Sequence, residues 1–249
     1  MYLIGYDLGS SSIKVAIVEV ESGKTIATAK FPDFEMEIIS TQANFAEQNP
    51  NLWWTYVCES TKAVLAKANI NKDEIKAIGI AYQMHGLVCV DENQEVIRNA
   101  IIWCDSRAVD IGNRAFEAIG EKKCLTSLLN SPGNFTASKL AWIKENEPEN
   151  YAKIYKIMWP GDFIVLKMTN EITTTVSGLS EGIFWDFQKS ELSKDILNHY
   201  KFDENIFPTI HDTFSIQGKL TQKAAKELGL SPNIPITYRA GDQPNNALS

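Results

Sequence analysis

The sequence predicts a mixed α/β fold. The first 30 residues are β-branched and apolar runs separated by turns, and a long segment with apolar residues on one helical face follows later. Beyond it, short apolar runs alternate with segments that carry helix start signals. At about 150 residues per domain, the 249 residues suffice for one or two domains with a core that needs no disulfides or metal.

Three strands open the chain. Residues 2–6 form a short apolar run, residues 13–20 are rich in β-branched side chains, and residues 24–30 follow a hairpin signal at 21–23. Residues 7–12, between the first two strands, have the composition of a turn. Because the connections are short, we expect an antiparallel meander.

A helix is predicted from Pro50 to about Ala68. Asn49 can cap it, and proline suits the first helical position. Apolar residues spaced by three, four and seven then fall on one face. The remaining expected elements are strands at 76–81, 87–90 and 234–238, an extended piece at 101–103, helices from 104–107 to about Ile119, at 193–199 and at 221–228, and a mostly helical region at 137–169.

Composition excludes several classes of protein. A net charge of −7 and a pI near 5.1 argue against a nucleic-acid partner, since such domains are normally basic. Lys76, Gln83 and His85 interrupt the most apolar stretch, so we expect no membrane span, and the start of the chain does not read as a signal peptide. The four cysteines form no close pair, which indicates reduced thiols in a cytoplasmic protein.

Residues 7–14 can hold a phosphate. Gly9 permits a tight turn, the serines at 10–12 offer hydroxyl donors, and Lys14 offers positive charge. Asp7 would repel phosphate unless a divalent cation lies between them, so it is a candidate magnesium anchor. The alternative is an ordinary serine-rich hairpin turn. No Gly-Lys-Ser/Thr follows, which excludes a Walker A loop.

Residues 82–86 can form a lip that binds a polyol. Here Gln83 and His85 would hydrogen-bond hydroxyls while Met84 covers an apolar face. The alternative is a satisfied histidine in a β-turn.

Trp103 and Asp105 also suit a sugar, because C–H faces stack on indole and a carboxylate accepts from hydroxyls. The alternative is a core tryptophan followed by a helix N-cap, with Arg107 on the surface.

The last candidate is Asp242, in a glycine turn after a predicted strand. It could accept the proton of a substrate hydroxyl. The alternative is an Asx-type turn. The sequence stops soon after this turn, so we expect a fragment of a longer protein.

Together these motifs identify a family. In their order along the whole chain, they resemble the FGGY carbohydrate kinases. The segments that carry the resemblance are 7–14, 45–50 with Trp53 and Trp54, 83–86, 100–107, 135–142, 181–186 and 241–243.

The resemblance implies an actin-like ATPase, or ribonuclease H-like, α/β fold. Such a fold has a mixed five-stranded sheet with an antiparallel N-terminal meander and flanking helices. Residues 1–249 would be the N-terminal domain, which holds the sugar and the first phosphate loop. The C-terminal domain, with most of the nucleotide site, is absent from this chain, which alone is expected to be inactive. The resemblance further implies ATP and Mg²⁺ as cofactors, a small-molecule sugar as partner, and allows a homodimer.

The resemblance also implies roles for single residues. Asp242 would be the catalytic base, and Asp7 would anchor magnesium through water. The phosphate-binding candidates are Ser10, Ser11, Ser12 and Lys14, and the sugar-lip candidates are Met84, His85, Trp103, Asp105, Asn134 and Gln243.

The lip indicates the sugar. Met84 and His85 stand where glycerol kinases carry an Arg-Glu pair, and the segment 83–86 resembles xylulokinases. We therefore expect D-xylulose, phosphorylated at its 5-hydroxyl. Gln243 and Asn134 depart from the common xylulokinase pattern. The alternatives are an FGGY kinase for gluconate, ribulose, a deoxyketose or glycerol, a non-catalytic sugar-binding module, and an actin- or chaperone-like ATPase.

Overall fold

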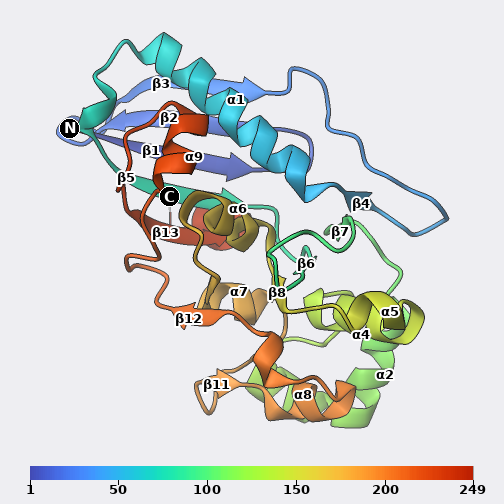
Figure 1. Ribbon diagram of the computed structural model, residues 1–249. Helices are drawn as coiled ribbons and strands as arrows, with labels where there is room; N and C mark the ends of the chain where they lie inside the picture. The colour runs from blue at the N-terminus through green and yellow to red at the C-terminus, as the bar shows by residue number, and fades with distance from the viewer. Residues whose placement is uncertain (249) are drawn as a thin grey trace.

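A five-stranded sheet forms one end of the molecule (Figure 1). The computed structural model describes residues 1–248, and Ser249, the last residue of the predicted domain, lies outside the described residues. The strand order is β13-β5-β1-β2-β3. The bounds of these strands are β1 Tyr2–Leu8, β2 Ile13–Glu19, β3 Thr25–Phe31, β5 Ile75–Tyr82 and β13 Ile236–Gly241.

The direction of the strands brings three of their ends together. β1 is parallel to β5, and β5 is parallel to β13, whereas β2 and β3 complete an antiparallel meander with β1. The predicted mixed sheet is therefore confirmed. In register, Leu8 lies opposite Tyr82, and Tyr82 lies opposite Gly241. The residues that follow these positions emerge at one edge of the sheet.

Helix α1, Pro50–Ala68, covers one face of the meander, as Figure 1 shows. Alternate residues of β1 and β2 are buried beneath it, which is the period expected of a sheet with one covered face. The Asn49 side chain accepts the backbone N–H of Asn51, and Pro50 opens the helix, as predicted. On the opposite face of β1, Gly5 is exposed and Asp7 is half-buried, so that face is open.

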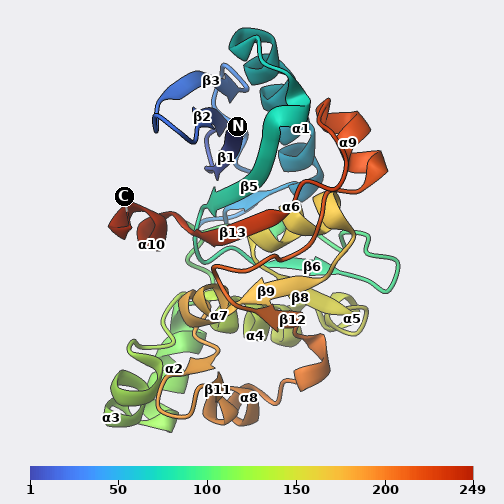
Figure 2. The ribbon, with the colours of Figure 1, turned by 90° about the vertical axis from the view of Figure 1, so that its left-hand side faces the viewer.

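The rest of the chain forms short strand pairs and helices below the sheet. Figure 2 shows α1 and α9 beside the sheet and α2, α3 and α8 at the opposite end of the molecule. The paired strands are β4 Glu47–Gln48 with β7 Ala100–Ile101, β6 Val88–Val90 with β8 Lys156–Met158, β9 Thr173–Thr175 with β12 Thr209–His211, and β10 Trp185–Asp186 with β11 Glu191–Leu192. The helices are α2 Val109–Ile119, α3 Glu121–Lys123, α4 Thr136–Asn146, α5 Pro148–Tyr151, α6 Pro160–Thr169, α7 Val176–Glu181, α8 Lys194–Tyr200, α9 Gln222–Leu228 and α10 Asp242–Ala247. Single turns of 3₁₀ helix lie at Lys72–Glu74 and Glu204–Ile206, and a π-helical turn lies at Cys124–Leu128.

Three boundaries differ from the sequence prediction. The region 137–169 contains strand β8, which exists because Val88–Val90 pairs with it. Strand β13 continues to Gly241, because its pairing with β5 extends to Tyr82, and Asp242 begins helix α10 rather than a turn. Helix α2 begins at Val109, later than predicted.

Two further predictions concern membrane spans and cysteines, and both are considered for residues 1–248. No helix in this range has both the length and the apolar character that crossing a bilayer requires. All four cysteines are free thiols, and only Cys104 is exposed.

Candidate active-site cleft

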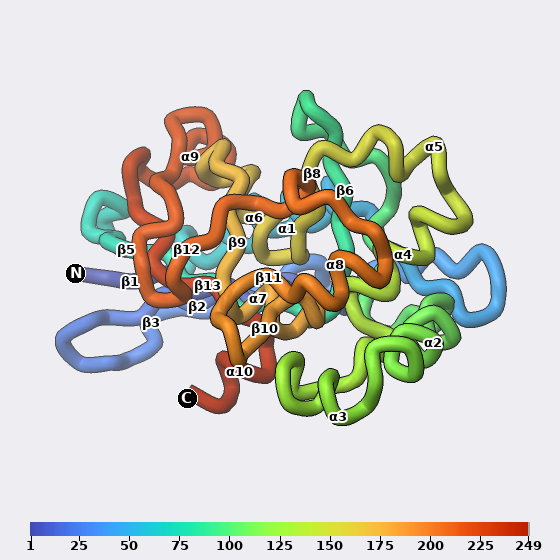
Figure 3. The backbone as a smooth tube through the Cα atoms, turned by 90° about the horizontal axis from the view of Figure 1, so that it is seen from below, coloured from blue at the N-terminus to red at the C-terminus, as the bar shows by residue number. Residues whose placement is uncertain are grey.

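An open cleft of about 1150 Å³ lies against the uncovered sheet face and the edge where β1, β5 and β13 end. α10 projects from the end of β13 (Figures 2 and 3), and Asp242 at its start lines the cleft. Chemically distinct parts of the sequence meet here, since the cleft is lined by Asp7, Ser10, Ser11, Lys14, Trp103 and Asp242. The topology explains the meeting, because carboxyl ends of parallel strands share one edge.

The loop between β1 and β2 is braced from inside the protein. The carbonyl oxygen of Ser12 accepts the backbone N–H of Gly9 at 3.2 Å. The carbonyl oxygens of Ser10 and Ser11 accept from the Gln48 side chain at 2.7 Å and from the Met36 backbone at 2.9 Å. Carbonyls that would repel an anion are therefore engaged within the protein. Ser12 is buried and does not line the cleft, unlike the two serines before it.

Two carboxylates face the cleft. Asp7 forms an ion pair with Lys14 at 3.0 Å, in which the lysine side chain is largely exposed and the carboxylate is half-buried. Partial burial, followed by the negative charge of Asp7, raises the pKa of Asp242 above its ordinary value. Within residues 1–248, no three His, Cys, Asp or Glu side chains gather as a ready-made metal cage. Asp7 nevertheless suits Mg²⁺, because this ion binds through one or two carboxylates together with substrate phosphates.

His85 is held in one orientation and one tautomer. Its backbone has a positive φ of 61°, and its ring packs edge-to-face on Phe135 with centroids 4.6 Å apart. Its Nδ1 lies 3.1 Å from the carbonyl oxygen of Glu181. A carbonyl only accepts, so we assign the proton to Nδ1 and leave Nε2 as the acceptor. Burial lowers the pKa of His85 to about 4, so the ring is neutral at neutral pH.

The two sides of the predicted lip touch at Gly241. A Cβ added to Gly241 would lie 2.4 Å from Met84 Cγ and 2.7 Å from Glu181 Oε2. Only glycine therefore allows β13 to pass this closely beside Met84. The residue before the candidate base packs directly against the lip that includes His85.

The sequence analysis assigned no role to Glu181. Its carboxyl is buried beside Gly241, and neither oxygen has a hydrogen-bond partner within the described chain. Burial, followed by the charge of Asp162, raises the pKa of Glu181 well above its ordinary value, which favours the protonated acid. Its sequence signal was slight, since an acid between serine and glycine is typical of a surface turn.

Trp103 joins the predicted lip to the loop between β1 and β2. Its side chain is 53% exposed, so the alternative of a core tryptophan is wrong. Its indole N–H donates to the Ser10 hydroxyl at 3.2 Å. Of the sugar-lip candidates in the described residues, Trp103 alone lines the cleft. Met84 and His85 do not line it, the amide of Asn134 donates to the carbonyl oxygen of Asp105, and Gln243 is exposed on α10.

Asp105 does not face the cleft, which corrects its assignment to the sugar lip. Its side chain is fully buried and pairs with Arg107 at 2.6 Å. It also accepts the backbone N–H of Ala46 at 2.6 Å and that of Arg107 at 3.0 Å. The guanidinium is buried as well, stacked 3.6 Å from the centre of the Phe45 ring, so Arg107 is not a surface residue either. Asp105 is a structural carboxylate behind Trp103.

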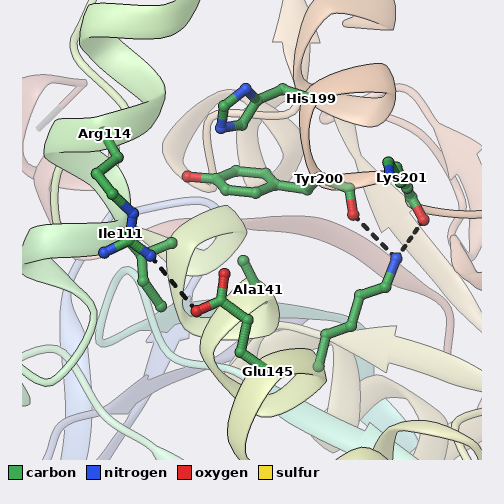
Figure 4. Close-up of a pocket in the computed structure, with 8 residues that line it drawn as sticks. Ile111, Arg114, Ala141, Glu145, His199, Tyr200 and Lys201 are labelled. Carbon is green, nitrogen blue, oxygen red and sulfur yellow. Dashed lines mark hydrogen bonds and ion pairs between the residues drawn. The ribbon is translucent and has the colours of Figure 1, made fainter.

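A smaller pocket of about 240 Å³, shown in Figure 4, lies between α2, α4 and α8. Arg114 pairs with Glu145 at 3.4 Å, and Lys144 donates to the carbonyl oxygen of Tyr200 at 2.9 Å. None of the candidate residues lines this pocket. The cleft at the sheet edge is therefore the candidate site.

Comparison with known proteins identifies the family. Residues 2–249 match the family model described as the FGGY family of carbohydrate kinases, N-terminal domain. The chain belongs to this family. A xylulose kinase from Staphylococcus xylosus is 32% identical over 251 residues, which cover 99% of this chain and 49% of the relative. This FGGY chain thus spans about half the length of the curated relatives it matches.

Solved FGGY-kinase structures share the fold. A xylulose kinase from Rhodospirillum rubrum superposes with a TM-score of 0.91 at 23% identity, over 100% of this chain and 50% of that one. A gluconate kinase from Lactobacillus acidophilus superposes with a TM-score of 0.87 at 22% identity, over 97% of this chain and 48% of that one. The predicted actin-like fold is thereby confirmed, and the fold by itself does not distinguish these sugars.

Proposed function

We propose that this chain is the sugar-binding half of an ATP-dependent kinase that phosphorylates D-xylulose at its 5-hydroxyl. The observation that carries the proposal is the meeting of Asp7, the serine loop and Asp242 in one cleft, beside the Met84–His85 lip. The xylulose kinases among its relatives support the choice of sugar. The cytoplasmic location and the homodimer stay predictions.

The proposed chemistry is phosphoryl transfer, in which catalysis is mainly positioning and charge stabilisation. Asp242 would orient the attacking hydroxyl and accept its proton as the bond to phosphorus forms. The Nε2 atom of His85 would accept a hydrogen bond from another hydroxyl, because its Nδ1 proton is committed to Glu181. Ser10, Ser11 and Lys14, which line the same cleft, would hold phosphate oxygens.

Asp7 is the residue that would hold Mg²⁺, through water. When bound, the ion supplies positive charge that neutralises the phosphates. Lys14, paired with Asp7 at 3.0 Å on the exposed rim, is free to turn toward a phosphate at little cost, since exposed ion pairs contribute about 0–1 kcal/mol.

The rival sugars are gluconate, ribulose, a deoxyketose and glycerol. Met84 lies against Gly241 and gives the lip an apolar side, which favours an uncharged polyol chain over gluconate. The test uses this chain joined to the proposed C-terminal nucleotide domain, here called the two-domain protein. A panel of these sugars in an ADP-release assay on that protein tests the choice. We expect the highest kcat/KM with D-xylulose. A higher value with another sugar changes the substrate, and no turnover with any of them favours a non-catalytic sugar-binding module.

The 249-residue chain, studied without the proposed C-terminal domain, gives a second prediction. With its large core, the 249-residue chain should unfold in one cooperative transition, since its apolar residues form a continuous buried cluster. It should not release ADP in the presence of D-xylulose, because half of the nucleotide site would be missing. Denaturant unfolding and the ADP assay measure both. Turnover by the separate chain would contradict the proposed division of the active site.

The lip gives a third prediction. His85→Ala should raise the KM for D-xylulose and leave the KM for ATP unchanged, with a loss of about 1–3 kcal/mol in kcat/KM for the sugar. His85→Asn is a second variant, because asparagine tolerates the positive φ at this position. His199→Ala is the control, since His199 also packs on an aromatic ring but lines the pocket of Figure 4. An altered ATP KM with an unchanged sugar KM would remove His85 from the sugar site.

A further inference from the structure

Lys139 is a buried lysine whose amine reaches two backbone segments of the candidate site. It lies in the first half of α4, and its side chain is fully buried. Its Nζ donates to the carbonyl oxygen of His85 at 2.8 Å and to that of Ile102 at 2.9 Å. The three residues are distant in sequence, so the amine cross-links parts of the chain that would otherwise meet only through side-chain packing.

Both carbonyls belong to segments that carry lip residues. The first lies in the turn between β5 and β6 that holds Met84 and His85, and the second directly precedes Trp103. The turn is a demanding conformation, since His85 has a left-handed backbone that costs a non-glycine residue free energy unless its surroundings hold it. Lys139 supplies one such constraint from behind the turn.

A buried ammonium is costly, which makes its placement informative. Burying a cation is tolerated only where hydrogen bonds and opposite charge compensate it. Burial lowers the pKa of Lys139 to about 8, and the negative charge of nearby Asp105 acts in the opposite direction. A hydrocarbon side chain would fill the same space without this penalty, so the amine is needed for what it bonds.

We propose that Lys139 is a positioning residue of the sugar site, which fixes the His85 turn relative to Trp103 by bonding the carbonyls of His85 and Ile102. This inference rests on the proposed function for the identity of the ligand. The relative position of the His85 Nε2 atom and the indole then determines which sugar hydroxyls the lip can accept. Lys139 does not touch the sugar, and it acts only through the two backbone segments.

Lys156 provides a matched control. Its Nζ also donates to two backbone carbonyls, those of Asn205 at 2.6 Å and Phe207 at 3.0 Å, but these lie away from the cleft. Lys156→Met removes the same kind of cross-link without touching the lip. Lys139→Met keeps the length of the side chain and removes its donors and its charge.

The first experiment compares these variants in the two-domain protein. Lys139→Met should raise the KM for D-xylulose about 5- to 100-fold, the range for buried carbonyls that lose their donor, and leave the KM for ATP unchanged. Lys156→Met should change neither KM. Equal effects of the two variants, or an unchanged sugar KM in a folded Lys139→Met protein, would overturn the proposal.

A second readout needs neither turnover nor the sugar. Burial is the main cause that lowers the pKa of His85 to about 4, and the positive charge of Lys139 adds to it, so Lys139→Met should raise the imidazole pKa in an NMR titration of the 249-residue chain. An unmoved imidazole pKa contradicts the inference. If no sugar is phosphorylated while the imidazole moves as expected, the proposed function fails and the contact between Lys139 and the His85 turn stands.

A third measurement uses the unaltered protein, in case Lys139→Met does not fold. On saturation of the two-domain protein with D-xylulose, the ¹⁵Nζ resonance of Lys139 should shift, because the two carbonyls it bonds belong to the segments that carry the proposed sugar lip. The ¹⁵Nζ resonance of Lys156 should not shift. If the Lys139 resonance also stays in a sample that binds the sugar, Lys139 is not linked to the lip.

Discussion

In the two-domain protein, Asp242→Asn should lower kcat about 10²- to 10⁴-fold, the usual contribution of a positioned base. Asparagine keeps the shape of the side chain but removes the charge and the basicity. Sugar binding should survive, because the amide can still bond a hydroxyl, and isothermal titration with D-xylulose tests this half. Turnover near that of the unaltered protein would remove Asp242 from the catalytic role.

The same carboxyl gives the pH dependence a direction. The base must be deprotonated, so kcat should fall as the pH drops through the pKa of Asp242. Partial burial and the charge of Asp7 raise this pKa, so the loss should occur at a higher pH than for an ordinary aspartate. The acidic limb should be missing from the residual activity of Asp242→Asn. Asp110→Asn, at an exposed position in the first turn of α2, is the control and should leave the profile unchanged.

If Asp242→Asn lost both sugar binding and turnover, Asp242 would have a different role. It would be a residue that binds the sugar rather than a base. Because α10 begins at this residue and the Asp242 carboxylate accepts the Gln243 backbone N–H at 2.8 Å, circular dichroism and thermal unfolding should accompany the assay. They separate a local loss of α10 from an effect on chemistry.

The parts of the fold that the sequence predicted are those with local signals. The meander and α1 were predicted because alternation, a hairpin signal, an N-cap and an N-terminal proline all lie within a few residues of the element they define. Strand β8 was missed because its three residues are extended only through pairing with β6, whose residues lie 66 to 70 positions earlier. Such pairing leaves no periodicity in the sequence.

The candidate site was predicted only in part, for a similar reason. Asp7 and Asp242 follow apolar runs, and the geometry of parallel strands brings such positions to one edge. Asp105 has the same composition around it as a sugar ligand would have. What decides its role is the Ala46 backbone, 59 residues away, and the orientation of Arg107. Neither is visible in the local sequence.

Asp105→Ala should destabilise the protein by about 3–5 kcal/mol, the usual effect of removing one partner from a buried ion pair. Asp105 and Arg107 are 0% and 1% exposed at their side chains, so water cannot replace the lost carboxylate. The Ala46 backbone N–H would also lose its acceptor. Urea unfolding of the 249-residue chain measures the change in free energy.

Asp195→Ala is the control for this prediction. Its side chain pairs with Lys123 at 2.6 Å, but the lysine is 54% exposed, so the loss should be about 0–1 kcal/mol. Asp105→Asn adds a second comparison, because its side-chain oxygen can still accept from Ala46 while the charge opposite Arg107 is gone. Its stability should fall between those of the unaltered protein and Asp105→Ala.

The outcome also decides between two roles for Asp105. As a structural carboxylate, it supports the segment of Trp103 from behind, with Arg107 held between the Phe45 and Trp142 rings and bonded to Glu47 at 2.7 Å. Loss of this pair should therefore reduce stability first, and sugar binding only through the altered segment. A stable Asp105→Asn protein with a strongly raised sugar KM would restore Asp105 to the sugar lip. Low stability with an unchanged sugar KM in the folded fraction would show that Asp105 contributes to the stability of the core alone. This is the outcome we expect, because a buried carboxylate that already accepts from Ala46 and Arg107 has little capacity left for a sugar hydroxyl.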